Sequence, residues 1–367
     1  MLDSAITGAR DYLVRHTSES GRYTYVIDSR GRELSDDYNV LRHGGTLYAL
    51  GELYRRRPDP DAKAAIARAG RYLAKNYLEP RPVAGTHAIW SKPGEELSGD
   101  ERAIKLGGAG LGLVALVATR EVAPEAVELD ALRGLGALIG AMQRPDGSFH
   151  SKMKPTGAFD TKFVSLYYPG EAILGLVRLY RIDPNPRWLG IAGRGVRQLV
   201  ESREDIDPED LPADHWLLIA IGELGTLLAE KPEVASALGV SFATMRKGAL
   251  RIADKMIAEQ RSAAASGSYG RHRRSTPTAT RLEGLFALLA ALPAGDEARG
   301  RIETSARRGV AFLLSCQVQS DDRRAGGIVR RCPPDDGSRR AAEIRVDYVQ
   351  HALSAFLGAR HLLVSGK

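Results

Sequence analysis

The chain has 367 residues, of which 43% are apolar and 26% charged, and it carries a formal net charge of +7 at pH 7. This composition is typical of a globular protein with a large buried core. No run of eighteen apolar residues occurs, and Met1–Arg15 has neither a basic leader nor a hydrophobic run. We therefore expect a soluble protein without a membrane span.

Only two cysteines are present, Cys316 and Cys332. Two are too few for a disulfide framework, which makes a cytoplasmic location the default, although this pair could join in an oxidising compartment. Basic residues cluster in the C-terminal third, at Arg271, His272, Arg273, Arg274, Arg323, Arg324, Arg330, Arg331, Arg339 and Arg340. Clustered arginines suit anions, and a solvated loop surface is the alternative.

Six segments along the chain have small residues near their start and an almost wholly apolar body. This texture is typical of helices that are buried on every side. The segments begin near Asp36, Glu101, Ser165, Ala213, Thr278 and Arg345. Strand-like alternation is scarce between them.

Amphipathic helices with charged faces alternate with these buried ones. They are predicted at Asp61–Tyr77, Ala126–Gln143, Pro186–Val200, Val240–Gln260 and Arg299–Gln317, and Leu2–Arg15 supplies a sixth. Each hairpin can bury its apolar face only against its neighbours. We therefore predict one all-α domain over residues 1–367, an (α/α)6 toroid with an inner and an outer ring of helices. An open α-solenoid is the alternative.

Short glycine-containing segments follow several outer helices. They are SGRYTYVID from Ser20, QRPDGSFHS from Gln143, SGSYGRH from Ser266 and AGGIVRR from Ala325. Their composition predicts β-hairpins or tight turns. All would lie at one rim of the toroid, around the mouth of its cavity, where loops on a rigid scaffold commonly carry function.

This pattern resembles the α/α-toroid superfamilies, namely six-hairpin glycosidases with related lyases and epimerases, and more distantly terpenoid cyclases and protein prenyltransferases. QRPDGSF is similar to the repeats of terpenoid cyclases, but their Asp-x-Asp-Asp acid motif and a diphosphate-binding aspartate cluster are absent. Ala325–Leu353 is distantly similar to the prenyltransferase β-subunit, with Asp347 and His351 in ligand-like places. The zinc-binding cysteine expected after Asp347 is missing, so we expect no zinc and no other cofactor.

By elimination the carbohydrate-active branch is the best match, and it implies an active site where the inner helices begin. Polar residues at those helix starts are conspicuous, because charges inside an apolar barrel are costly unless paired or used. Glu171 and Asp214 are the predicted acid and base, with Asp37 as a further carboxylate. The alternative proton-transfer groups are His43, His215, Tyr168 and His351. Glu283 belongs to the same set of polar residues without an assigned role.

Substrate-binding residues are predicted of two kinds. Arg42, Lys105, Arg271 and Arg281 would hold an acidic group, because guanidinium matches carboxylate geometry. The aromatic residues Trp90, Phe149, Tyr167, Trp216 and Tyr269 would stack on sugar rings. Asp347 and Gln350 complete the set from the last inner helix. The alternative role for each aspartate is to cap a helix, and for about half of the aromatic residues it is to pack the hairpins onto the barrel.

We therefore expect an enzyme that cleaves or epimerises an anionic, uronate-containing saccharide by hydrolysis, elimination or epimerisation. Two alternatives remain open. A terpenoid- or prenyl-handling toroid would show a cavity lined mostly by aromatics with one acid, and a peptide-binding or scaffold toroid would lack paired carboxylates. Nucleic-acid binding is not expected, because the basic residues form no recognisable motif. The sequence leaves the oligomeric state undetermined.

Overall fold

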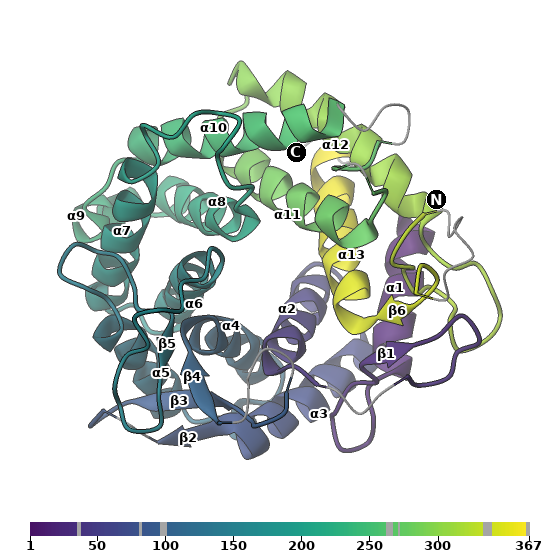
Figure 1. Ribbon diagram of the computed structural model, residues 1–367, viewed down its shortest axis with the longest axis horizontal. Coiled ribbons are helices and arrows are strands. Elements are labelled where there is room, and N and C mark those ends of the chain that lie inside the picture. The colour runs from purple at the N-terminus through teal and green to yellow at the C-terminus, as the bar shows by residue number, and fades with distance from the viewer. Residues whose placement is uncertain are drawn as a thin grey trace.

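The computed structural model describes residues 1–34, 38–80, 83–95, 101–261, 267–270, 272–332 and 340–364. Its centre is a ring of helices that all run in the same sense (Figure 1). They are α2 (Val40–Arg56), α4 (Leu106–Val122), α6 (Tyr168–Ile182), α8 (His215–Glu230), α11 (Ser275–Ala291) and α13 (Val346–Ala359). Each packs against the next, and α13 packs against α2. The ring is therefore closed, which confirms the toroid and excludes the open solenoid.

A second ring encloses the first (Figure 1). It comprises α1 (Leu2–Arg15), α3 (Pro60–Tyr77), α5 (Leu129–Ala141), α7 (Pro186–Glu201), α10 (Phe242–Arg261) and α12 (Ala298–Ser315). Shorter pieces are α9 (Ala235–Leu238), the 3-10 turns η1 (Pro124–Ala126) and η2 (Pro232–Val234), and the π-helical η3 (Arg360–Val364). The predicted sixth outer helix is confirmed as α1, which packs against the last inner helix, α13.

Helix α4 illustrates why the inner segments are rich in glycine. Every residue from Leu106 to Thr119 is buried. At Gly110 a Cβ atom would lie 2.5 Å from the backbone carbonyl carbon of Glu171, and at Gly175 it would lie 2.8 Å from the carbonyl oxygen of Gly110. The backbones of α4 and α6 thus approach too closely for side chains, and glycine is the residue that permits this contact.

The glycine turns at the rim share one construction. Gln143 donates Nε2 hydrogen bonds to the carbonyls of Ile191 (2.9 Å) and Gly147 (3.2 Å). Gly147 has φ +91°, and a Cβ there would lie 2.7 Å from the carbonyl oxygen of Arg194 on α7. A positive-φ glycine meets the next outer helix in the same way at Gly21, Gly267 and Gly326. QRPDGSF is therefore a clamp between neighbouring hairpins.

The structure adds two small antiparallel sheets that the sequence did not reveal. One contains β2 (Leu78–Pro80), β3 (His87–Ser91), β4 (Ala103–Lys105) and β5 (Lys152–Met153), in that order. Because β4 occupies residues 103–105, α4 begins later than the predicted start near Glu101. The other pairs β1 (Val26–Ile27) with β6 (Ile344–Arg345), which joins the segments that precede α2 and α13.

A disulfide joins Cys316 and Cys332, whose Cα atoms are 5.3 Å apart. Cys316 is the C-cap of α12, and the backbone N–H of Cys332 donates to the carbonyl of Arg273 at 3.1 Å. The bond therefore ties α12 to the loops that lead into α11. Within the part of the chain that the structure describes, no helix is long and apolar enough to cross a membrane.

Candidate active site

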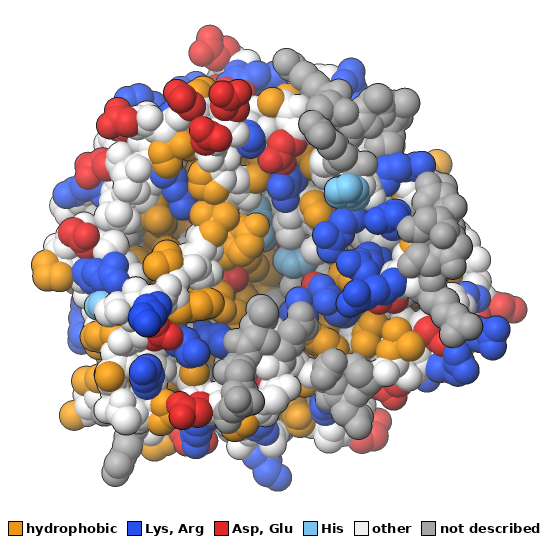
Figure 2. Space-filling model, in the orientation of Figure 1, with side chains coloured by type: hydrophobic (Ala, Val, Ile, Leu, Met, Phe, Trp, Pro, Cys, Tyr) orange, Lys and Arg blue, Asp and Glu red, His pale blue; other side chains and the backbone are white. Residues whose placement is uncertain are grey.

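A cavity of about 320 Å³ opens where the inner helices begin. Figure 2 shows the hollow, with hydrophobic side chains on the side of α6 and α8 and Lys and Arg side chains on the side of β1 and β6. The predicted site residues that line it are Arg42, Tyr167, Tyr168, Glu171, His215, Trp216, Arg281, Asp347, Gln350 and His351. Below it a small apolar cluster around Tyr48, Leu174 and Ile219 fills the barrel.

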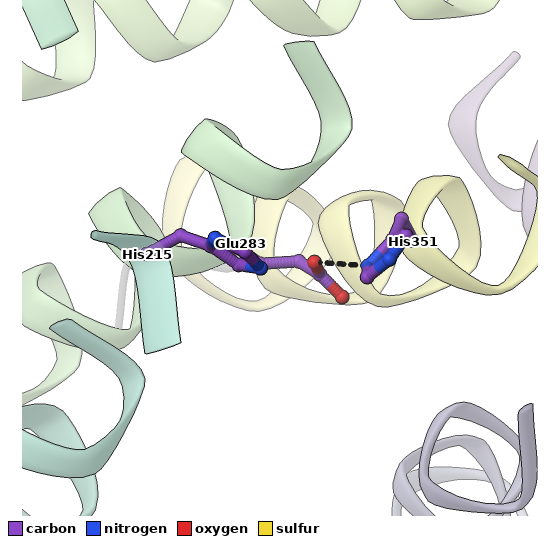
Figure 3. A group of neighbouring side chains, drawn as sticks. All are labelled: His215, Glu283 and His351. Atoms are coloured by element: carbon purple, nitrogen blue, oxygen red, sulfur yellow. Dashed lines mark hydrogen bonds and ion pairs between the residues drawn. The ribbon is translucent and has the colours of Figure 1, made fainter. Parts of the chain in front are cut away.

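The first polar feature of the cavity is a histidine–carboxylate pair between two adjacent inner helices. His351 on α13 and Glu283 on α11 are joined by a hydrogen bond of 2.7 Å from Nδ1 to Oε2 (Figure 3). Burial alone would lower the pKa of His351, but the Glu283 carboxylate outweighs burial and raises it. The Glu283 carboxylate thus favours the charged form of His351, and the other ring nitrogen, Nε2, lies 3.5 Å from the side-chain nitrogen of Gln350.

A second histidine lies beside this pair. His215, the first residue of α8, has its ring centroid 6.0 Å from that of His351. It is 4% exposed, and neither ring nitrogen has a hydrogen-bond partner among the described residues. Burial, together with the charges of His351 and Arg281, holds its pKa well below the ordinary value. The surroundings of the two histidines therefore shift their pKa values in opposite directions, down for His215 and up for His351.

Glu171 contributes a carboxyl group from the first turn of α6. It is 5% exposed and its Oε2 has no hydrogen-bond partner in the described structure. Burial and then the charge of Asp214 raise its pKa to about 8. A Cβ on Gly107 of α4 would lie 2.1 Å from this Oε2, so the glycine creates the space the carboxyl occupies. At neutral pH Glu171 is mainly a neutral acid and can donate a hydrogen bond.

The arginine wall is organised around Asp347 on α13. Arg345 donates to both carboxylate oxygens, at 2.6 and 3.0 Å, and Arg42 Nε lies 3.2 Å from Oδ2. Burial opposes ionisation, but these two cations outweigh it and lower the pKa of Asp347. On the other side of the cavity Arg281 is paired with Glu259 at 3.0 Å. Arg42 and Arg281 thus line the cavity as predicted, each beside a carboxylate.

Three of the predicted polar residues have other roles. Asp214 is 0% exposed and caps α8, accepting from the backbone N–H of Leu217 at 3.1 Å and from Arg203 at 2.9 Å. It is not among the residues that line the cavity, so its position gives no support to the prediction of a second catalytic carboxylate here. The capping alternative accounts for it.

His43 is also withdrawn from the cavity. Its Nδ1 bonds the hydroxyl of Tyr38 at 2.6 Å and its Nε2 bonds the carbonyl of Ala69 at 2.9 Å. Burial lowers its pKa to about 4. Lys105 is buried as the N-cap of α4 and does not line the cavity either. Asp37 and Arg271 lie outside the described residues.

The predicted aromatic residues divide in the same way. Trp216 and Tyr167 line the cavity, and each has its ring against His215, with centroid distances of 5.2 and 5.1 Å. Phe149 instead packs on Gly195 of α7, and Tyr269 bonds Ser305 of α12 at 2.7 Å. Trp90 is covered by the guanidinium of Arg102, 3.9 Å from its ring centroid. These last three hold rim segments to the scaffold.

Several residues of the site were not assigned a role from the sequence. Glu283, which bonds His351 but does not itself line the cavity, stood among the polar candidates without a role, and the signal that could have raised it is its isolation in the apolar body of α11. Arg274, Thr276, Thr280, Asn39 and Arg345 line the cavity. Their positions just before or within the first turns of inner helices are the shared signal. Ordinary polar helix starts look the same, so only the closed ring distinguishes them.

His215, Glu283 and His351 also deserve a test as metal ligands, because their donor atoms all lie within 4.8 Å of one another. Two imidazoles and one carboxylate are a suitable donor set for a divalent transition metal. The arginines around the cavity oppose a further cation, and Glu283 is already engaged by His351. The ligand pair considered from sequence does not form, because Asp347 is engaged by Arg345. Absence of a cofactor stays a prediction.

The closed double ring with polar groups at the helix starts defines an α/α toroid of the six-hairpin type. No protein-family model and no curated protein sequence matches the chain. Solved structures match over almost its whole length. Cellobiose 2-epimerase from Bacillus thermoamylovorans B4167 gives a TM-score of 0.70 at 14% identity, covering 98% of this chain and 100% of that chain.

Two further structures match over a similar share of the chain, with lower TM-scores. A D-mannose isomerase gives a TM-score of 0.66 at 11% identity, covering 98% of this chain and 97% of that chain. An unsaturated glucuronyl hydrolase specific for heparin gives 0.65 at 10% identity, covering 99% and 97%. These likenesses establish the six-hairpin toroid fold that the sequence predicted.

Proposed function

We propose that the protein is a carbohydrate-active enzyme that moves a proton to and from a carbon of a saccharide, as an epimerase or isomerase does. One observation carries this proposal: His215 and His351 line the same cavity with their ring centroids 6.0 Å apart, and His351 is bonded to a carboxylate whereas His215 has no hydrogen-bond partner in the described structure. Exchanging a proton at a carbon beside a carbonyl requires one group that is free to accept and one that is ready to donate.

The hydrogen bonding of the two histidines assigns the roles in the starting complex. His215, neutral and without a hydrogen-bond partner, accepts the carbon-bound proton on a ring nitrogen. His351, whose protonated form Glu283 favours, donates from Nε2 to the adjacent position or to the opposite face of the same carbon. Glu283 holds the imidazole ring of His351 in place by its bond to Nδ1, so it is a positioning residue.

Glu171 complements the pair. Removing a proton beside a carbonyl places negative charge on the carbonyl oxygen, and this charge must be stabilised in the transition state. A carboxylic acid that stays protonated near neutral pH can donate a hydrogen bond to such an oxygen. Glu171, with a pKa of about 8 and an unused Oε2, has the protonation state for this role.

The cavity wall supports a saccharide with an acidic group. Trp216 and Tyr167 offer flat apolar faces with polar neighbours, which suits sugar rings. Arg42, Arg281 and Arg345 give the cavity lining cationic side chains, and guanidinium groups match carboxylates. The similar structures include proteins named as cellobiose 2-epimerase, D-mannose isomerase and unsaturated glucuronyl hydrolase, which supports a saccharide substrate.

Hydrolysis is the second candidate, because a protonated glutamate in a cavity is also what a glycosidase uses as its general acid. Glu171 lacks the second carboxylate that a glycosidase needs as base or nucleophile, because Asp214 is a helix cap and Asp347 is held by arginines. The terpenoid alternative loses support because the cavity is lined by charged groups as well as aromatics. A purely structural role is also not supported, because neither ring nitrogen of His215 makes a hydrogen bond to the described part of the protein.

The test is isotope exchange in D2O. The protein is incubated with aldoses, ketoses, and neutral or uronate-containing disaccharides, and NMR follows loss of the proton on the carbon beside the carbonyl. We expect exchange with at least one saccharide. In His215→Asn and His351→Asn it should fall by about 10² to 10⁴. His150→Asn is the matched control, because His150 stacks on Phe159 at the rim and does not line the cavity.

Two outcomes would refute the proposal. Exchange that survives in both cavity variants would show that neither histidine transfers the proton. Cleavage of a glycosidic bond without exchange, abolished in Glu171→Gln, would replace epimerisation by hydrolysis. A cytoplasmic location stays a prediction, and the Cys316–Cys332 bond favours an oxidising compartment instead.

A further inference from the structure

The arginines of the cavity are not equivalent. Arg42 and Arg345 share Asp347, and Arg281 is paired with Glu259. Arg274 also lines the cavity, yet it has no ion pair and no hydrogen bond to an acceptor among the described residues, and its Nε is buried without a partner. A buried guanidinium nitrogen without an acceptor is costly unless a ligand provides one.

The backbone around Arg274 is held in place by hydrogen bonds to the neighbouring segment. Arg274 pairs with Arg331 in an antiparallel bridge, and the N–H of Ser275 donates to the carbonyl of Arg330 at 3.0 Å. The disulfide at Cys332 anchors the same segment. Like charges directly opposite one another across such a bridge are unfavourable. The fold thus places Arg274 at the cavity wall in spite of an electrostatic cost.

The residue before it adds a second cost. Arg273 has φ +49°, the left-handed region, and among the described residues it is the one non-glycine with positive φ. Side chains other than glycine, asparagine and aspartate rarely adopt this conformation, and such strain is concentrated at functional sites. The turn at Arg273 directs the chain into α11 with Arg274 at its N-cap position.

The groups beside Arg274 also favour an anion. The hydroxyl of Thr276 lines the cavity and has no partner among the described residues. Both residues stand at the N-terminus of α11, a 17-residue helix whose dipole is positive at that end. Asp347, the ionised carboxylate of the wall, is already neutralised by Arg42 and Arg345.

We propose that Arg274 is the specificity-determining residue of the site, and that with Thr276 it binds the carboxylate of a uronosyl unit in the substrate. This inference rests on the proposed saccharide function and deepens it by naming the group that selects the acid. The guanidinium fork takes the two carboxylate oxygens in a bidentate pair, and the Thr276 hydroxyl donates a further hydrogen bond to one of them. A neutral sugar leaves Arg274 without an acceptor and binds more weakly.

Binding of three matched probes tests this inference by calorimetry. They are a glucuronosyl disaccharide, the glucosyl disaccharide that differs only in the oxidation state of C6, and its 6-O-sulfated form. Wild-type protein should bind the glucuronosyl probe more tightly than the glucosyl probe. Arg274→Gln should weaken binding of the glucuronosyl probe about 10- to 100-fold and leave the affinity for the glucosyl probe within about twofold of wild type.

Two further variants define the role. Arg274→Lys keeps the charge but loses the fork, so it should retain only part of the preference for the glucuronosyl probe. Arg330→Gln is the matched control, because Arg330 lies on the neighbouring segment, does not line the cavity, and should keep the wild-type preference. If Arg274→Gln does not fold by circular dichroism, the Lys variant with its graded loss decides the question.

The inference is overturned if Arg274→Gln keeps the preference for the glucuronosyl probe, if its affinity for both probes falls equally, or if wild-type protein binds no acidic probe. Tighter binding of the sulfated than of the glucuronosyl probe would replace the carboxylate by a sulfate ester. Because calorimetry needs no turnover, the two proposals fail separately. Arg274-dependent binding without deuterium exchange refutes the epimerase function alone, and exchange without Arg274 dependence refutes the specificity role alone.

Discussion

Replacing Glu171 by glutamine should change how stability depends on pH. In the folded protein the pKa of Glu171 is raised from 4.5 to about 8, because burial and Asp214 disfavour its charged form. Between these two values the folded state holds a proton that the unfolded state has released. Stability therefore falls as pH rises through this window. At about 1.4 kcal/mol per pKa unit, the wild-type protein should lose about 3.5 kcal/mol between pH 5 and pH 8 through this residue.

Glutamine cannot ionise, so Glu171→Gln should escape this loss. For a chain of this length, about 3.5 kcal/mol corresponds to about 4 to 5 °C in Tm. Calorimetric Tm values at pH 5, 6, 7 and 8 should therefore show the variant gaining on wild type by about that amount as pH rises. Glu233→Gln, at an exposed position, should run parallel to wild type. Parallel curves for Glu171→Gln would refute the buried neutral carboxyl.

Three other perturbations follow from particular contacts. Gly107→Ala would drive a methyl group into the Glu171 carboxyl and the Tyr168 ring, and calorimetry should show a loss of about 1 to 3 kcal/mol. Reducing the Cys316–Cys332 disulfide, 16 residues apart, should cost about 3 kcal/mol, seen as a lower Tm with two titratable thiols. Dialysis against a chelator should leave Tm and isotope exchange unchanged, whereas a loss restored by zinc would place a metal at His215, Glu283 and His351.

The fold could be predicted from sequence because each inner helix has a texture that no surface helix has. The stretch from Leu106 to Thr119 contains no charge, and all of it is buried. The amphipathic α7 shows the opposite pattern, with arginines among its apolar residues. The short strands could not be predicted in this way, because a two-residue pair such as β1 with β6 depends on where the ring brings distant segments together.

The site was predictable only as a location. Asp214 and His215 are consecutive at the start of α8, and sequence treats them as equal candidates. The N-cap residue turns its side chain back onto the free N–H groups of the helix, which is where Asp214 accepts from Leu217. The residue after it points along the first turn, which brings His215 to the cavity. Two consecutive residues thus have different roles, Asp214 as a helix cap and His215 as the proposed proton-transfer group.

Pairing across the ring decides which of the remaining polar residues are available. Glu283 and His351 are 68 positions apart and become one unit only because α11 and α13 are neighbours. The packing of α13 against α2 likewise brings Arg42 to Asp347, and Arg274 is left without an acceptor in the described structure. A charged residue that the ring leaves unpaired at a cavity wall is where a ligand must supply the missing charge. The sequence contains these residues, but the pairing that distinguishes them exists only in the closed toroid.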